Sequence, residues 1–563
     1  MQTVLCLSAL ALSLGAAPVA NPQLDLGAVG AVSVHQRCAP AARPELERGV
    51  ALLHSFFYEE ARTSFQKAAE RDPRCATAWW GEAMTYYHPL WAPPSPEGIA
   101  AGTAAADRAL KLGGKSPIEV GLISAIHAYW HDRLPPGVKS GSAKNGSAEG
   151  IPSCHGGAPT PGGRAEAFRA TLEDLHRRFP ADVEVTAFYS LALLGTAPKE
   201  DRSLAQQKRA AGLLERAWAS HPKHPGLVHY LIHAYDYPEI AQQGLKAADA
   251  YAAVAPQVPH ALHMPSHIYV RLGQWNENIR SNLRSIEAAS RWMAVRHPGG
   301  VMADTFHALD YLGYGYLQQG REKEARDVVR QVATEREVYP PLEFPAAFAR
   351  AMAPARFVLE REAWAEAAKL EVAPITASER FPFVNGLVVY TRGIGAARMG
   401  DVQGARAAAA QLAEHAKAVE TGPYAYFGKL LTAHRLAVLG WTAHVEKKDA
   451  EAKKLLAEAA ALEEAIGPHQ VSPGPLLPSR ELLGDLLLEL GEPGPARSAY
   501  EQSLVHAPGR LRSLGGAMRA AARAGDAPLR KSYAKKVLAL AGESHSAIVS
   551  EARAMDGAAV PGQ

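Results

Sequence analysis

The chain has 563 residues, of which 47% are hydrophobic and 21% are charged. These fractions are typical of soluble globular proteins, and they exclude a disordered or fibrous chain. Lysine and arginine together number 60 against 57 for aspartate and glutamate, so the formal net charge is +3. Because proteins that bind nucleic acids usually carry a marked basic excess, no nucleic-acid partner is expected.

The first residues predict a signal peptide. An apolar run extends from Val4 to about Ala17, with no Lys or Arg before it, and small residues follow it. Its length suits the apolar part of a signal peptide and is too short to span a bilayer. Residues 1–20 are therefore expected to direct export to the periplasm or the medium. No later run is apolar for long enough to predict a transmembrane anchor.

Three cysteines would remain after removal of this segment: Cys38, Cys75 and Cys154. An odd number allows at most one disulfide bond among them. A bond between Cys38 and Cys75 is one possibility in an oxidising compartment, and three unpaired thiols are the other. The sequence contains no CxxC motif, so a zinc ribbon or a thioredoxin-type redox motif is excluded.

A repeating pattern begins near residue 42. Its first copy consists of residues separated by steps of 3, 9, 4, 3 and 5, namely Gly49, Leu52, Ala61, Phe65, Ala68 and Pro73. Later copies place a small residue at the position of the first glycine, namely Ala83, Gly313, Gly393 and Gly484. A small residue there lets the two helices of a pair pack closely. The recurrence predicts antiparallel helix pairs, each of which buries its apolar face only against its neighbours.

This pattern resembles that of the tetratricopeptide repeat superfamily over most of residues 42–541. The resemblance implies an all-α fold, in which stacked antiparallel helix pairs form a right-handed superhelix, an α-solenoid. It also implies a scaffold that binds a protein or peptide partner on its concave face, without catalysis. The segments HYLIHAYD and HALHMPSHIYVRLGQW resemble those of a group of poorly characterised bacterial proteins with these repeats, and the predicted signal peptide adds export. The oligomeric state does not follow from these resemblances.

Composition divides the repeats into groups. A stretch dense in Gly, Ser and Pro predicts a flexible insertion on which an N-terminal lobe could hinge. The expected order is N-terminal repeats at 42–133, the insertion at 134–163, central repeats at 164–345, C-terminal repeats at 346–541 and a tail at 542–563. A second proline-rich stretch, at 473–478, is expected to be an ordinary connection between helices.

The central repeats contain two groups of histidines. HYLIHAYD contributes His229 and His233, and HALHMPSHIYV contributes His260, His263 and His267. His263 follows His229 by 34 residues, as His267 follows His233, so each pair occupies the same repeat positions. In the resembling repeats these positions line the concave groove. Residues four apart on a helix lie about 6 Å from each other, a spacing that suits two imidazoles binding one metal ion.

The expected groove also includes nearby polar residues. Its full set is His229, His233, Asp236, His263, His267, His307, Asp310 and Tyr314. Four of these, His229, His233, His263 and His267, are candidate ligands for a divalent ion of Zn, Cu, Ni or Fe. Asp236 and Asp310 would be further ligands or would orient the imidazoles. Because Pro265 favours the first turn of a helix, a helix is expected to begin near Met264, with His260 and His263 in the preceding loop.

Other histidine pairs are weaker candidates. His127 and His131 are four residues apart, but no second pair lies in phase with them. His54 and His88 are 34 residues apart, so they could extend the groove, but a single histidine on a helix is more often structural.

Three interpretations of the central histidines remain open. They could line a groove for a peptide or a small acid, hold a metal ion, or pack between helices as hydrogen-bonded groups. The leading hypothesis is an exported scaffold that binds a protein or peptide partner. The alternative is a metal-binding protein or metalloenzyme. The chain has no HExxH, GxSxG or P-loop motif, so no catalytic residue is assigned and any chemistry would need a bound metal.

Overall fold

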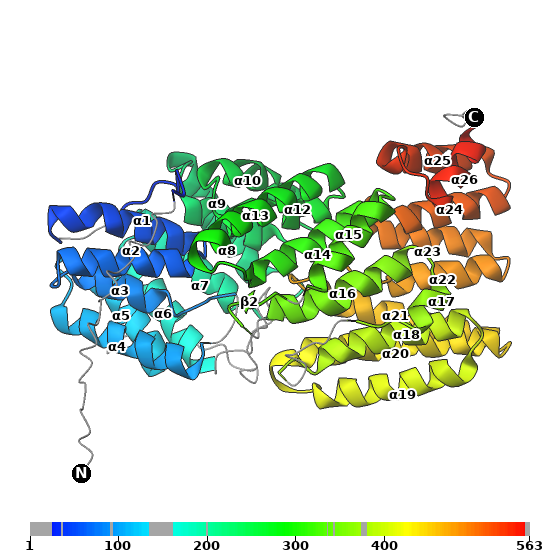
Figure 1. The fold of residues 1–563 in the computed structure, drawn as a ribbon, viewed down its shortest axis with the longest axis horizontal. Helices are drawn as coiled ribbons and strands as arrows, with labels where there is room; N and C mark the ends of the chain where they lie inside the picture. Colours follow the sequence, from blue (N-terminus) through cyan, green and yellow to red (C-terminus); the bar gives the residue numbers. More distant parts are fainter. Residues whose placement is uncertain are drawn as a thin grey trace, which may run out of the picture.

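The computed structural model describes residues 25–34, 38–90, 94–133, 162–198, 201–334, 336–341, 344–372 and 380–557. The predicted signal peptide at 1–20 and most of the insertion at 134–163, including Cys154, lie outside the described residues. Figure 1 shows the chain passing from its N-terminal repeats at one end of the long axis to its last helices at the other.

The described residues fold almost entirely into antiparallel helix pairs. In the first half these are α1 (Arg43–His54) with α2 (Tyr58–Arg71), α3 (Ala76–Met84) with α4 (Pro96–Leu112), α5 (Pro117–His131) with α6 (Gly162–Arg178), α7 (Val183–Gly195) with α8 (Ala205–Ser220), α9 (Pro225–Tyr235) with α10 (Ala241–Val254), and α11 (Pro259–His263) and α12 (Pro265–Arg271) with α13 (Trp275–Arg296). In the second half they are α14 (Ala303–Gln318) with α15 (Glu322–Val332), α16 (Phe344–Glu360) with α17 (Trp364–Ala368), α18 (Phe383–Arg398) with α19 (Val402–Ala418), α20 (Ala425–Val445) with α21 (Asp449–Ile466), α22 (Ser479–Glu489) with α23 (Pro493–His506), and α24 (Leu511–Arg523) with α25 (Ala527–Ala541). The predicted all-α solenoid of stacked helix pairs is confirmed.

Short elements complete the fold. Two 3₁₀ turns, η1 (Pro40–Ala42) and η2 (Gly422–Tyr424), precede α1 and α20. β1 (Val301–Met302) pairs in parallel with β2 (Val338–Tyr339). The segment expected as a tail contains a further helix, α26 (Ala547–Asp556), which packs on α25. No helix among the described residues is both long enough and apolar enough to cross a bilayer.

Two glycines of the repeat pattern, Gly49 and Gly484, make room for aromatic rings, whereas Gly313 faces Val328 and Gly393 faces Ala408 and Val438. Phe65 of α2 packs between Gly49 of its own pair and Gly81 of the next pair. A Cβ atom added to Gly49 or Gly81 would lie 2.8 Å or 2.2 Å from Cε1 of that ring. Each aromatic ring therefore joins two consecutive repeats, which is how local residue choice produces a stack.

The superhelix also brings repeats together that are not consecutive. α1 contacts α9, and α14 contacts α24. The prediction that each pair buries its face only against its neighbours is therefore wrong. The stack curls tightly enough for its inner faces to meet, so its concave side is largely filled by protein.

Two large hydrophobic clusters form the core. One extends from Leu26 to Met302, and the other from Ile279 to Ala552. The first cluster includes residues on both sides of the insertion, so the N-terminal repeats share one core with the repeats that follow them. The expected hinge at 134–163 is wrong because α5 packs on α6 and α1 packs on α9 across it.

A disulfide bond joins Cys38 to Cys75, with a Cα–Cα distance of 5.0 Å. It connects the segment before η1 to the residue that precedes α3. Of the two possibilities left open by the cysteine count, the structure has the one with a bond.

Substitution of the packing glycines should destabilise the stack. In Gly516→Val, the added side chain would begin 2.3 Å from Cε1 of Tyr500, so we expect the free energy of unfolding to fall by about 1–3 kcal/mol. Gly494→Ala is the control, because a Cβ there meets no atom within 4 Å. Urea unfolding followed by circular dichroism measures both, and equal stability of Gly516→Val and the parent would contradict this account of the packing.

Candidate metal centre

The eight residues expected to line a groove are inside the protein. Each is at most 4% exposed. Two features account for this. The curl of the superhelix brings α1 against α9, and segment 467–478 enters the concave side, where Arg271, Tyr311 and Arg356 bond to its carbonyl groups. The structure therefore corrects the expectation of an exposed, histidine-lined groove.

The first histidine cluster is formed by His229 and His233 of α9 with His260 of α11. The Nε2 atom of His229 lies 3.0 Å from Nε2 of His233 and 3.1 Å from Nε2 of His260. On its other side, His229 donates from Nδ1 to the backbone carbonyl of His54 over 2.7 Å. This bond assigns the ring proton to Nδ1, so Nε2 presents a lone pair toward the other two rings.

The second cluster is formed by His263, His267 of α12 and His307 of α14. Each of the three rings has a nitrogen that lies within 4.8 Å of a ring nitrogen of each of the other two. His263 donates from Nδ1 to Oδ1 of Asn282 over 2.7 Å, and the amide nitrogen of Asn282 is occupied with the Asn278 carbonyl. These contacts leave Nε2 of His263 as a lone pair directed into the cluster.

His267 is held in the same way by a carboxylate. Its Nδ1 donates to Oδ2 of Asp236 over 2.9 Å, while Oδ1 of Asp236 accepts from Nε of Arg271 over 3.0 Å. Burial raises the pKa of Asp236 to about 6, and Arg271 opposes that rise. Asp236 is thus a group that orients an imidazole rather than a direct ligand, one of the two roles expected for it.

The two oriented rings face each other in an arrangement that a positive charge between them would stabilise. Nε2 of His263 and Nε2 of His267 are 3.0 Å apart, and with the ring protons assigned to Nδ1 each Nε2 carries a lone pair. A proton would relieve the repulsion, but burial lowers the pKa of His263 to about 4 and that of His267 well below its ordinary value. Two nitrogens that bind one tetrahedral Zn²⁺ at about 2.0–2.1 Å lie roughly 3.3 Å apart, close to the observed separation.

In a third buried cluster, the hydrogen-bonding groups all have partners within the protein. His54 and His224 contact opposite oxygens of Glu184, over 2.8 Å and 3.1 Å. His54 also bonds Tyr230 over 2.9 Å, and the backbone of Ser33 donates to Glu184 over 2.8 Å. The two histidines hold the pKa of Glu184 well below its ordinary value against the effect of burial. These three residues also lie close enough together to hold an ion, but their hydrogen bonds are complete without one.

The remaining predicted residues lie outside the clusters. Asp310 accepts from Nε of Arg356 over 3.1 Å, and the hydroxyl of Tyr314 accepts from Nη1 of Arg510 over 3.1 Å. Neither belongs to a group of possible ligand atoms among the described residues. His127 and His131 lie beside Asp107 at the surface, at 3.2 Å and 2.7 Å.

The ligands predicted from the sequence do not include His260, which belongs to the first cluster. The predicted loop at His260 and His263, before a helix that starts near Met264, is wrong. Instead, α11 begins at Pro259 and α12 begins at Pro265, so each proline occupies a first helical turn. Two short helices in succession keep His263 and His267 within contact of each other. Pro259 was the available signal, since it marks a helix start one residue before His260.

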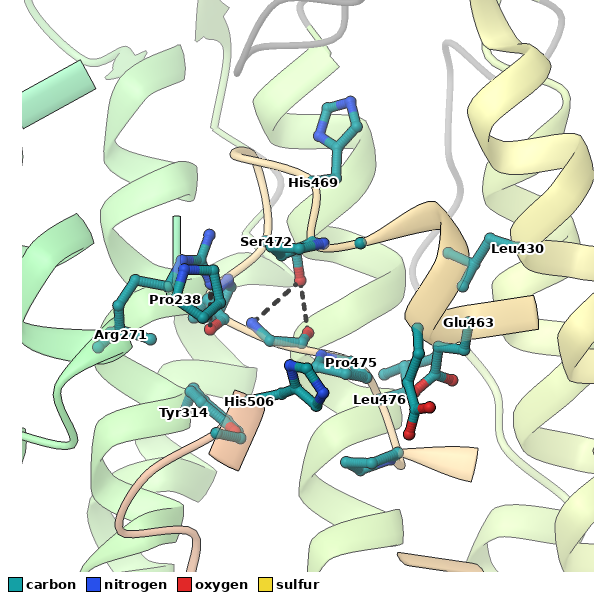
Figure 2. Close-up of a pocket in the computed structure, with 18 of the residues that line it drawn as sticks. Pro238, Arg271, Tyr314, Leu430, Glu463, His469, Ser472, Pro475, Leu476 and His506 are labelled. Atoms are coloured by element: carbon teal, nitrogen blue, oxygen red, sulfur yellow. Dashed lines mark hydrogen bonds between the residues drawn. The ribbon is translucent and has the colours of Figure 1, made fainter. Parts of the chain in front are cut away.

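A cavity lies beside the clusters. Its empty volume is about 1150 Å³, including space open to solvent, and Arg271, Tyr314 and His434 are among its lining residues. The segment 467–478 forms part of its wall (Figure 2). Pro473 accepts from Nη1 of Arg271 over 3.2 Å, so this segment is tied to the centre of the molecule and is more than the ordinary connection expected. A second cavity reaches His233, which offers a route from solvent to the first cluster.

The comparisons with known proteins add little. No family model and no curated protein matches the chain. Similar solved structures include the human IFIT1 dimer with PPP-AAAA (13% identity, TM-score 0.35, 87% of this chain and 89% of that chain), the APC/C hetero-tetramer Cut9–Hcn1 (13%, 0.28, 90% and 95%) and the yeast Tom70 (12%, 0.27, 92% and 96%). Likeness at this level carries no argument about a site, so the site stands on the contacts described above.

The cavity wall predicts a dependence of stability on pH. Burial raises the pKa of Glu463 to about 7, although Ser479 donates to its carboxylate. The folded state therefore holds a proton that the unfolded state releases near pH 4.5, and stability is lost as the pH rises from about 4.5 to 7. Glu463→Gln should remove this loss and stabilise the protein at pH 8 by up to about 3 kcal/mol, less where water reaches the half-buried side chain.

Denaturant unfolding at pH 5 and pH 8 measures this effect. Glu464→Gln is the control. The carboxylate of Glu464 is next in sequence to Glu463 but forms a surface ion pair with Arg480, and such pairs are worth about 0–1 kcal/mol. A stabilisation by Glu463→Gln that is the same at both pH values would contradict the prediction.

Proposed function

We propose that this chain is a transition-metal-binding α-solenoid. His229, His233 and His260 would hold one divalent ion, and His263, His267 and His307 would hold another close by. The observation that carries this proposal is the 3.0 Å approach of Nε2 of His263 to Nε2 of His267 while each ring donates from Nδ1 to a protein oxygen. Neutral imidazoles, with no thiolate or carboxylate among the proposed ligands, suit Zn, Cu, Ni or Fe(II).

Support also comes from the groups around the ligands. In metal sites the second ring nitrogen of a histidine usually donates to a carbonyl or carboxylate, which fixes the tautomer. His229 does so to the His54 carbonyl, and His267 does so to Asp236. Three protein ligands per ion leave a position for a further ligand, as in catalytic zinc sites. We assign no reaction to it.

We also propose that the protein is exported. The Cys38–Cys75 disulfide supports this, because such bonds persist in oxidising compartments. Binding of a protein or peptide partner remains a separate prediction from the helical-repeat fold. Because the eight residues expected to contact it are buried, such a partner would need other residues.

Metal analysis tests the main proposal. We expect untagged protein to carry about one or two equivalents of transition metal by mass spectrometry, one for each cluster. His263→Ala/His267→Ala should lose the ion of the second cluster. His127→Ala/His131→Ala is the matched control, since it also removes two histidines four residues apart but at the surface. Equal metal content in both double variants would contradict the assignment.

A second measurement does not depend on the folding of a variant. After chelation, the parent protein should gain about 2.7 kcal/mol of unfolding free energy per site when free Zn²⁺ is raised to about 100 times its dissociation constant. A chelated parent that neither takes up Zn, Cu or Ni nor gains stability would rule out the proposal.

The orienting carboxylate gives a finer test. Asp236→Asn keeps an oxygen for His267 but loses the negative charge, so metal affinity should fall about 10–100-fold. Competition with a chromogenic chelator measures the affinity. Glu184→Gln is the comparison, because Glu184 serves the cluster that is complete without an ion, and it should leave metal affinity unchanged.

A further inference from the structure

The cavity beside the metal clusters has mostly apolar walls. Trp275, Phe348, Met352, Phe427 and Leu430 contribute to its lining. Figure 2 shows Arg271 and Pro238 on one side of the segment around Ser472, with Leu430 and Glu463 on the other. A mostly apolar lining with a few polar groups is typical of a site for a small organic molecule.

Most charges at its edges are already neutralised. Arg202 pairs with Glu239 over 3.2 Å, and Arg480 pairs with Glu464 over 2.7 Å. These pairs are partly exposed and leave no net charge to select a ligand.

Two deeper groups each have a nitrogen without a partner in the described part of the chain, although Arg271 is itself paired with Asp236. Arg271 is 5% exposed, and its Nη2 has no hydrogen-bond partner among the described residues, although Nε and Nη1 are bonded. His434 is 1% exposed and stacks on Tyr390, and neither of its ring nitrogens has a partner in the described part of the chain. Buried polar groups are almost always hydrogen-bonded, so an unpartnered guanidinium nitrogen and imidazole on a cavity wall point to a bound molecule.

We propose that this cavity binds an apolar monocarboxylic acid, whose carboxylate accepts from Nη2 of Arg271 while its chain lies against Met352, Phe427 and Leu430. A guanidinium provides a planar set of donors that matches a carboxylate, and the bond is stronger than one to a neutral acceptor. The neutral imidazole of His434 offers a further donor to a polar group on the same molecule. This inference does not depend on the metal clusters.

Decanoate is a suitable probe, with decanol and decylamine as matched controls for its head group. We expect calorimetry on the chelated protein to show decanoate binding at one site, with decanol weaker by about tenfold or more because it lacks the charge. Decylamine should not bind. Chelation separates this result from any contact between a carboxylate and a metal ion, so the two proposals fail independently.

Two variants locate the site. Leu430→Trp should place an indole where the chain of the acid is proposed to lie and so weaken decanoate binding, whereas Leu283→Trp, at a residue 47% exposed, should not change it. Arg271→Gln should reduce decanoate affinity to that of decanol. Failure of decanoate to bind, equal affinity for decanol, or undiminished binding to a folded Leu430→Trp variant would each overturn the proposal.

Discussion

The curl of the superhelix determines the chemistry of its interior. Contacts between α1 and α9 and between α14 and α24 close the concave side, where a helical-repeat protein would otherwise present a solvent-filled groove. Polar side chains at the inner positions therefore lose water and must find partners within the protein. Arg510, which is completely buried, does so with Glu360 and Glu481, each over 2.7 Å.

The histidine clusters differ in how far this pairing is complete. Around Glu184, the carboxylate accepts from its neighbours and no lone pairs are forced together. Around His263 and His267, the outer nitrogens are paired but the inner ones face each other. The same residue type in the same kind of burial thus yields a structural network in one place and a candidate ligand set in another. The two clusters differ in which ring nitrogens are assigned the protons.

The sequence predicts the helix pairs better than the curvature of the stack that they form. Equivalent positions of His229 and His263 follow from the 34-residue period, and the glycine that faces Phe65 follows from the pattern of small and aromatic residues. The contact of α1 with α9 has no local signal, because a small rotation between successive repeats adds up over several pairs. This accumulated rotation determines the burial of the site. The role of the His54 carbonyl and the inward path of segment 467–478 depend on it as well.

The two ends of a solenoid are its weakest places, because a terminal repeat has only one neighbour. Here α26 covers the last pair, whereas the first pair is fastened by the Cys38–Cys75 bond. That pair includes His54, whose carbonyl accepts from His229. Reductive opening of the bond would free the segment before α1 from the start of α3. The far end of α1 would then be held by its packing on α9 and by the bond from His229 to the His54 carbonyl.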